Sequence, residues 1–231
     1  MPDEDLVGRL LYRDALMLII DKPAGLSVHE GGQGGASLRT MLPALRFGLP
    51  RTPELAHRLD RDTSGCLVLG RHRRALARLG RLFAEGRVDK VYWALTVGAP
   101  AQAQGVIDRP LLKTGPGRMA VHRRGQPSQT SWRLLGSMGR IAWLELRPLT
   151  GRMHQIRVHL AHAGHPIVGD KIYGPSEQHY LTFIQTGWTA ALESALLLRR
   201  HALHSAVLEI PDDALRWEAA LAPDLQAFLS D

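Results

Sequence analysis

Cysteine is almost missing from the sequence, and its scarcity excludes two kinds of site. Cys66 is the single cysteine among 231 residues. Neither an internal disulfide nor a zinc site made of cysteines can therefore form. A reducing compartment suits such a chain, and we expect a cytoplasmic protein.

Long apolar runs are missing as well. The most apolar stretch near the N-terminus, residues 15–20, is far too short to span a bilayer. Residues 1–5 are acidic and lack the features of a signal peptide. We therefore expect a soluble protein with no membrane partner.

Acidic residues are outnumbered by basic ones. The chain has 22 Asp and Glu against 29 Lys and Arg, a formal net charge of +7 and a pI near 10.2. The surplus is nearly all arginine, whose guanidinium group pairs well with phosphates. This charge attracts polyanions, and nucleic acid is the commonest soluble one. Because many basic proteins bind no nucleic acid, charge alone leaves the partner open.

Apolar residues are plentiful enough to build a core. They make up 45% of the chain. No internal repeat or long linker interrupts the sequence, so we expect one domain over residues 1–231. Alternating or continuous apolar residues predict strands at residues 15–20, 66–69, 91–97, 129–135, 140–148 and 202–210, with a hairpin turn at residues 137–139.

Helical spacing appears between these strands. It predicts helices at residues 37–45, 72–85 and 152–163. Near the C-terminus, Asp212 and Asp213 are expected to cap a final helix that Pro223 breaks in two. Adjacent strands mixed irregularly with helices favour an α+β fold, with a mixed, mostly antiparallel central sheet flanked by helices and loops.

The densest polar cluster is a loop at residues 57–65, just before a predicted strand. Asp60 lies between Arg58 and Arg61, and neighbouring positive charge favours an ionised carboxylate. Such a carboxylate can act as a nucleophile or as a base. An ordinary salt-bridged turn is the alternative, and the local chemistry alone favours it.

A second cluster, residues 151–157, begins a predicted helix. In a helix, His154, Arg157 and His162 fall near one face, while Ile156 points elsewhere. A solvated polar helix face is the alternative. The histidines of this region match no metal-binding spacing and have no acidic ligand between them, so we expect no metal.

Three further segments have ordinary structural explanations. Tyr92 is either a core aromatic or a stacking platform for a base. Residues 169–174 form a glycine-bounded loop without the pattern of a phosphate cradle. The segment from Lys22 to Gly25 is interpreted mainly as a turn, with a contact site as the less favoured alternative.

Taken together, these segments resemble the RluA-type pseudouridine synthases. Residues 57–65 are identical to the His-Arg-Leu-Asp-x-x-Thr-Ser-Gly signature of that family, which is highly specific. The resemblance covers roughly residues 15–210. It rests on an ordered set of motifs at residues 21–29, 57–65, 90–94, 151–157, 164–170 and 203–205.

The resemblance implies roles for particular residues. Asp60 corresponds to the invariant aspartate, Arg157 to its ion-pair partner, and Tyr92 to the residue that packs on the target base. Ile156 would help to form an apolar floor, and Arg58 would assist extrusion of the base. The remaining expected substrate-binding residues are His57, Arg61, Lys22 and His154.

The resemblance also implies an activity and a partner. Uridine in a stem-loop of ribosomal or transfer RNA would be isomerised to pseudouridine, by a monomer without metal or organic cofactor. Asp60 would either attack the ribose or remove a proton from it. A non-catalytic RNA-binding module or RNA chaperone of the same fold is the alternative.

The sequence departs from the family pattern in three places. Ser205 replaces a usual alanine, and residues 175–199 match no family motif. The first motif begins at residue 21, so we expect no separate N-terminal RNA-binding domain.

Overall fold

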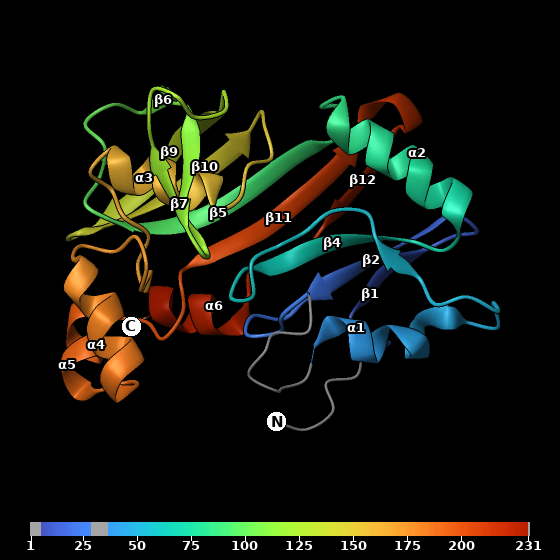
Figure 1. Ribbon diagram of the computed structural model, residues 1–231, viewed down its shortest axis with the longest axis horizontal. Coiled ribbons are helices and arrows are strands. Elements are labelled where there is room, and N and C mark those ends of the chain that lie inside the picture. Colours follow the sequence, from blue (N-terminus) through green and yellow to red (C-terminus); the bar gives the residue numbers. More distant parts are fainter. Residues whose placement is uncertain (1–5, 29–36, 231) are drawn as a thin grey trace. The chain divides into compact units, whose positions relative to one another are not determined.

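A computed structural model describes residues 6–28 and 37–230 (Figure 1). They belong to two compact units. The first unit contains the chain up to Lys90 and again from His204 onward, and the second runs from Val91 to Leu203. No helix in the described part of the chain is long and apolar enough to cross a bilayer.

The first unit is built on a mixed sheet. Its strands follow the order β1, β2, β4, β11, with β3 on β4 and β12 on β11. Strand β2 is antiparallel to β4, with Lys22 opposite Gly65, whereas β11 is parallel to β4, with His204 opposite Ser64. The strands are β1 (Leu10–Arg13), β2 (Met17–Lys22), β3 (Glu54–Leu55), β4 (Ser64–Gly70), β11 (Leu203–Ile210) and β12 (Leu215–Glu218).

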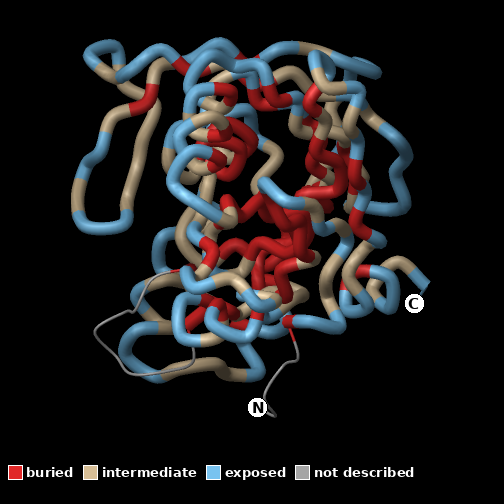
Figure 2. Tube along the Cα trace, turned by 90° about the vertical axis from the view of Figure 1, so that its right-hand side faces the viewer, coloured by how far each residue is buried: buried red, intermediate tan, exposed pale blue. Residues whose placement is uncertain are grey.

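The core of this unit lies between the sheet and helix α2 (Arg73–Ala84). Leu79 and Leu82 of α2 belong to the same buried cluster as Met17, Cys66 and Leu208. Strands β2, β4 and β11 are buried at nearly every residue, and Figure 2 colours such buried residues red. The shorter helices of the unit are α1 (Leu38–Met41), η1 (Leu42–Arg46), η2 (Pro211–Asp213) and α6 (Pro223–Ser230).

The second unit has an antiparallel sheet in the order β5, β10, β9, β6, and a separate hairpin of β7 and β8. Its strands are β5 (Asp89–Val97), β6 (Gln104–Asp108), β7 (Leu111–Gly115), β8 (Arg118–Val121), β9 (Gln129–Met138) and β10 (Ile141–Pro148). Its helices are α3 (Gln155–His162), α4 (Glu177–Thr186) and α5 (Ala190–Leu196).

The predicted α+β class is confirmed. Each predicted strand overlaps an observed strand, and the helix predicted over residues 72–85 is α2. The predicted hairpin joins β9 to β10, although its turn consists of Gly139 and Arg140, and the first two residues of the predicted turn belong to β9.

The C-terminal prediction is wrong. Asp212 and Asp213 lie in η2, and Ala214 has a positive φ of 53°, after which the chain continues into β12. Pairing of β12 with β11 outweighs the local capping signal. Pro223 starts α6 and does not break a helix, because a missing N–H is no loss in the first turn.

Two predicted helices are shorter than expected. Helix α3 begins at Gln155 and not at residue 152. Helix α1 covers one turn after Ser37, whose side chain makes no capping hydrogen bond, and then continues as the 3-10 helix η1. Residues 175–199, which matched no motif, contain α4 and α5. His29, part of the first motif, lies outside the described residues.

Candidate active site

Lys22 fastens the turn after β2 to the loop that carries Asp60. Its side chain is fully buried, although it carries an ammonium group. Nζ donates hydrogen bonds to the carbonyl oxygens of Pro23 (2.7 Å), Leu26 (3.1 Å) and Arg61 (2.9 Å). Because a buried ammonium is costly without such acceptors, Lys22 stabilises one arrangement of this backbone.

A second pair of hydrogen bonds closes the same junction. The N–H of Gly25 donates to the carbonyl of Arg61 (3.0 Å), and Nε of Arg61 donates to the carbonyl of Gly25 (3.0 Å). Gly25 has a φ of +84°, which glycine adopts without steric strain. Arg61 is an exposed residue, so it combines a backbone contact with accessible charge.

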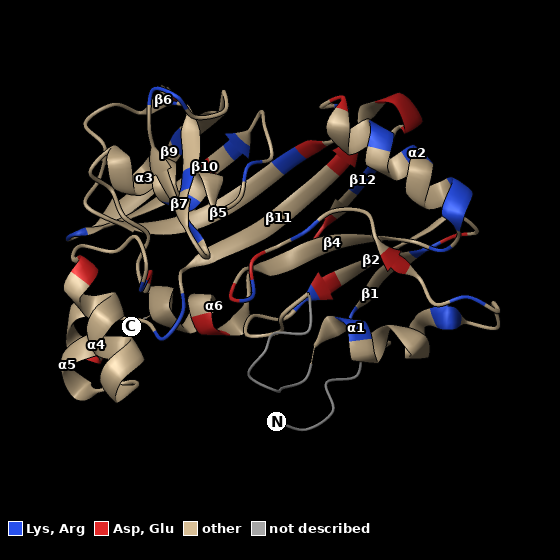
Figure 3. Cartoon of the chain, viewed as in Figure 1, with Lys and Arg blue, Asp and Glu red and all other residues tan. Residues whose placement is uncertain are grey.

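Asp60 lies in the compact turn that leads into β4. The N–H of Thr63 donates to the carbonyl of Asp60 (3.2 Å), which closes a turn of residues 60–63. Asp60 is partly buried, Leu59 is buried, and Arg58 is exposed. Figure 3 shows basic and acidic positions close together along this loop. The carboxylate is therefore carried by an anchored backbone with arginines on either side in the sequence.

His57 anchors the start of the loop. Its Nε2 accepts a hydrogen bond from the backbone N–H of Val68 (3.1 Å), and its ring stacks on Phe83 with centroids 4.5 Å apart. Burial, followed by the charge of Lys90, lowers the pKa of His57 to about 3. The ring is thus neutral at ordinary pH, as its acceptor role requires. The contacts of His57 stabilise the loop, and its role in binding substrate stays a prediction.

The end of the loop is fixed by a close approach of β4 to β11. Gly65 has a φ of +103°, and a Cβ at this position would lie 2.2 Å from the carbonyl oxygen of Ser205. Next to it, Oγ of Ser64 hydrogen-bonds with Nδ1 of His204 (3.0 Å). Two motifs that are distant in sequence, residues 57–65 and 203–205, are therefore in direct contact in the fold.

In the second unit, Arg157 forms a buried ion pair with Asp170. Nε and Nη2 of Arg157 donate to the two carboxylate oxygens at 2.7 and 2.9 Å, with exposed side-chain fractions of 5% and 0%. One of these oxygens also accepts the backbone N–H groups of Ile172 and Tyr173, each at 3.0 Å. Burial acts to raise the pKa of Asp170, but Arg157 and then His201 hold it well below its usual range.

Asp170 is the partner of Arg157 that sequence reasoning missed. It lies in the glycine-bounded loop of residues 169–174. Gly169 has a φ of +76°, and a Cβ there would lie 1.9 Å from the carbonyl oxygen of Arg200. The signal that could have identified Asp170 is its place as the last residue of the motif at residues 164–170, directly after Gly169, a glycine that the fold requires.

Tyr173 links His154 to Arg157. His154 precedes α3 with a φ of 54°, so it lies outside the helix in which it was predicted, although it contacts the same tyrosine as Arg157. Nδ1 of His154 instead hydrogen-bonds with the hydroxyl of Tyr173 (2.8 Å), and the Arg157 guanidinium lies 5.1 Å from the centre of the Tyr173 ring. The Tyr173 hydroxyl also accepts the N–H of Met119 (2.9 Å).

Most of helix α3 is buried, although His162 at its end is exposed. Ile156, Arg157 and Leu160 have exposed fractions of 6%, 5% and 1%, so the surface of the helix around Arg157 is not a solvated polar face. Tyr92 on β5 is 8% exposed and lies opposite Leu146 of β10. Tyr92 and Ile156 therefore offer apolar surface with little solvent contact.

His159 of α3 has structural partners for both ring nitrogens. Nδ1 of buried His159 hydrogen-bonds with Oγ1 of Thr130 (2.9 Å), and its Nε2 with the carbonyl of Arg109 (2.9 Å). Burial lowers the pKa of His159. Within residues 6–28 and 37–230, no three His, Cys, Asp or Glu side chains are grouped as metal ligands would be.

The expected site residues fall into two groups. The members of each group belong to the same unit. Asp60 and Arg157 belong to different units, and the ion pair expected between them remains a prediction. The first group is Lys22, His57, Arg58, Asp60 and Arg61, and the second is Tyr92, His154, Ile156 and Arg157.

Comparison with known proteins identifies the family. A family model described as RNA pseudouridylate synthase matches residues 16–162, which include Asp60, Tyr92 and Arg157. The chain belongs to the RNA pseudouridylate synthase family. Its members are isomerases that convert uridine to pseudouridine in RNA, so the predicted family and class of enzyme are confirmed.

Individual relatives agree with this assignment. An uncharacterized RNA pseudouridine synthase of Zymomonas mobilis is 41% identical over 209 residues, covering 88% of this chain and 90% of the relative. Ribosomal large subunit pseudouridine synthase C of Vibrio parahaemolyticus is 41% identical over 176 residues, covering 74% of this chain and 54% of the relative. The chain thus spans about half the length of that synthase.

A solved structure supports the fold as well. The human protein named RNA Pseudouridylate Synthase Domain Containing 4 superposes with a TM-score of 0.80 and 30% sequence identity. The match covers 97% of this chain and 93% of the human one. The pseudouridine synthase fold that the sequence predicted is therefore confirmed.

Proposed function

We propose that this pseudouridine synthase isomerises uridine in ribosomal RNA, with Asp60 as the catalytic carboxylate. The observation that carries the proposal is the anchored loop of residues 57–65. Its motif is matched in full, and Lys22, His57 and Gly65 fix its backbone at three points. The choice of ribosomal RNA is supported by the printed name of the Vibrio relative.

Asp60 suits a reaction at the ribose. The reaction breaks the bond from ribose to the base nitrogen, turns the uracil and rejoins it through carbon 5. Glycoside hydrolases need a second carboxylate to activate water, whereas an isomerase has to keep water out. One carboxylate is therefore enough. Attack on the sugar and removal of a sugar proton are both open to Asp60.

Arg157 is proposed to hold Asp60 in its ionised form. Positive charge next to a carboxylate favours ionisation where burial opposes it. Asp170 is then a positioning residue, because it fixes the Arg157 guanidinium through two hydrogen bonds. In this proposal the two units work as one catalytic domain, since the motif residues are divided between them.

Tyr92, Ile156 and Arg58 are proposed to handle the base. Extruding a base from its stack costs a few kcal/mol, and stacking on an aromatic side chain returns about 1–3 kcal/mol. Tyr92 and Ile156 are buried enough to exclude water from such a base. Exposed Arg58 can assist extrusion. His57, Arg61, Lys22 and His154 support this site.

We also propose that the protein acts as a cytoplasmic monomer on an RNA stem-loop. The single, buried Cys66 fits a reducing compartment. The surplus of arginine fits a phosphate backbone.

Mapping pseudouridines in RNA from a strain that lacks the gene tests the substrate. Loss of a modification in ribosomal RNA, restored by the wild-type gene and not by a gene encoding Asp60→Ala, is the expected result. Loss confined to transfer RNA contradicts the choice of ribosomal RNA. Restoration by the Asp60→Ala gene contradicts the role of Asp60.

A further inference from the structure

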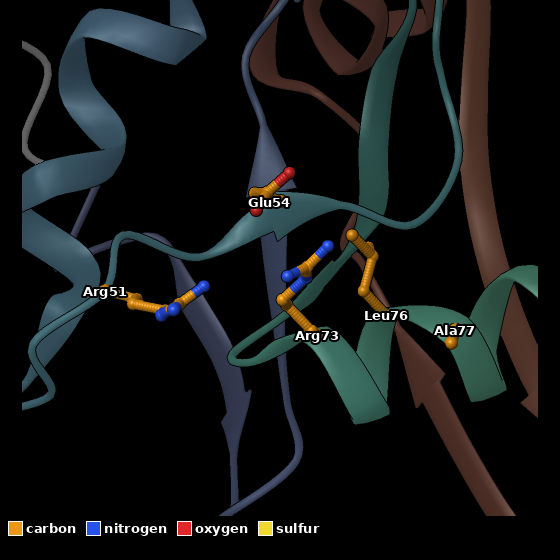
Figure 4. A pocket seen from close by; sticks show the side chains of 5 residues that line it. All are labelled: Arg51, Glu54, Arg73, Leu76 and Ala77. Carbon is orange, nitrogen blue, oxygen red and sulfur yellow. The ribbon is translucent and has the colours of Figure 1, made fainter.

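A charged hollow lies at the end of β4 that is farther from the Asp60 loop. It measures about 550 Å³ and is lined by Arg51, Glu54, Arg73, Leu76 and Ala77, all in the first unit. Figure 4 shows Arg51, from the loop before β3, and Arg73, from the first turn of α2, extending towards the same space. Leu76 and Ala77 supply an apolar wall.

The hollow lies where α2 packs closely on the end of β4. A Cβ on Gly70 would lie 2.9 Å from the Cα of Leu76. Glu54 of β3 pairs with Gly70, which brings β3 alongside the same strand end. The floor of the hollow is therefore part of the sheet and of α2, and not a loose surface loop.

Neighbouring arginines differ in how they are used. Arg46 donates from Nε to Oγ1 of Thr52 (3.0 Å), and Arg71 donates to the carbonyls of Asp14 and Arg46. The side chains of those two arginines are used in hydrogen bonds within the protein. Arg51 and Arg73, in contrast, are exposed and have no hydrogen-bonded or ion-paired side-chain partner within the described residues.

The charge of the hollow is compensated only in part. Its lining carries two guanidinium groups and one carboxylate, and Glu54 forms no ion pair with either arginine within the described part of the chain, so a net positive charge remains. Arg73 is the first residue of α2, where the helix dipole disfavours a cation, and the first turn has no acidic residue. An anion placed between the two arginines would relieve both sources of repulsion.

We propose that this hollow binds a backbone phosphate of the substrate RNA, with Arg51 and Arg73 as its ligands. The inference rests on the proposed function and adds a second contact to it. The hollow lies at Gly70 and the Asp60 loop ends at Ser64. Six residues of strand separate them by about 20 Å. For an RNA stem that runs along β4, with one phosphate per roughly 3.4 Å of strand as in duplex DNA, the contact falls about six base pairs from the target uridine.

Binding of labelled RNA hairpins tests the proposal. Two hairpins with the same uridine-containing loop, one with a stem of about 12 base pairs and one of about 4, differ in whether they can reach the hollow. Arg51→Ala and Arg73→Ala are compared with Arg81→Ala. The control removes the same charge from an exposed position of the same helix.

Salt dependence is the decisive readout. Losing one phosphate contact lowers the slope of log affinity against log salt by about 0.9. Between 50 and 200 mM salt, wild type and Arg81→Ala should therefore lose about 3.5-fold more affinity for the long hairpin than Arg73→Ala or Arg51→Ala does. The four proteins should agree on the short hairpin.

Equal slopes for Arg73→Ala and Arg81→Ala on the long hairpin overturn the proposal, as does an equal difference on both hairpins. Tritium release by the wild-type protein from RNA labelled at uracil carbon 5 judges the proposed function separately. Release together with equal slopes rejects the hollow alone. Absence of release rejects the proposed function, whatever the slopes.

Discussion

Replacing Asp170 with asparagine should destabilise the protein strongly. The substitution preserves the size of the side chain and an oxygen for the amides of Ile172 and Tyr173. It removes the charge that compensates Arg157, whose side chain is 5% exposed. Breaking a buried pair in this way costs about 3–5 kcal/mol. That is a large part of the 5–15 kcal/mol by which domains are commonly stable.

Equilibrium unfolding in urea measures this effect, and Asp213→Asn is the matched control. Asp213 pairs with Arg78 at 2.6 Å, but the two side chains are 23% and 39% exposed. A pair open to solvent contributes about 1 kcal/mol or less. A destabilisation by Asp170→Asn no larger than that of Asp213→Asn would refute the reasoning.

The same pair predicts a dependence on pH. The pKa of Asp170 is lower in the folded protein than in the unfolded chain, so its stabilisation is present above the unfolded value, near 3.9. It is lost as pH falls below that value, because the unfolded chain then binds a proton that the folded protein does not. The difference in unfolding free energy between wild type and Asp170→Asn should therefore shrink between pH 5 and pH 2.

A double substitution separates stability from catalysis. Arg157→Met with Asp170→Leu removes both charges of this buried pair, so most of the stability lost in Asp170→Asn should return. Tritium release should stay lost, because the proposed partner of Asp60 is gone. Full activity in the double variant would contradict the role proposed for Arg157.

Three further predictions concern β4 and β11. Gly65→Ala should lower the unfolding free energy by about 3 kcal/mol or more, because its Cβ meets the Ser205 backbone at 2.2 Å, whereas Gly80→Ala, in an open helical position, should be neutral or stabilising. Ser205→Ala should raise it by about 1–3 kcal/mol, because the buried Ser205 hydroxyl has no hydrogen-bond partner within the described residues. Burial raises the pKa of Cys66 to about 12, so iodoacetamide should modify this thiol only after unfolding, as mass spectrometry would show.

Sequence patterns predicted the parts of the fold whose burial follows a local period. Strand β4 is buried at every residue and α2 has an apolar stripe, so both could be read from the sequence. Strands β6 and β8 were missed because they are largely accessible and carry no clear alternation. Strand β12 depends on β11, a neighbour that local patterns do not reveal.

The sequence predicts candidate site residues but not their contacts. Resemblance to the family implies roles for Asp60, Tyr92 and Arg157, which lie within the matched region. It did not reveal that Lys22 binds three backbone carbonyls, or that Asp170 holds Arg157. Both contacts depend on how turns bring distant segments together, which spacing along the chain does not encode.

The most direct test of the account is tritium release by Asp60→Asn and Asp62→Asn. The two substitutions remove the same charge from the same loop, two residues apart. Asp60→Asn should abolish release from RNA labelled at uracil carbon 5, while Asp62→Asn should retain it and both proteins should unfold at similar urea concentrations. Release by Asp60→Asn at the wild-type rate would contradict the central claim that Asp60 is the catalytic carboxylate.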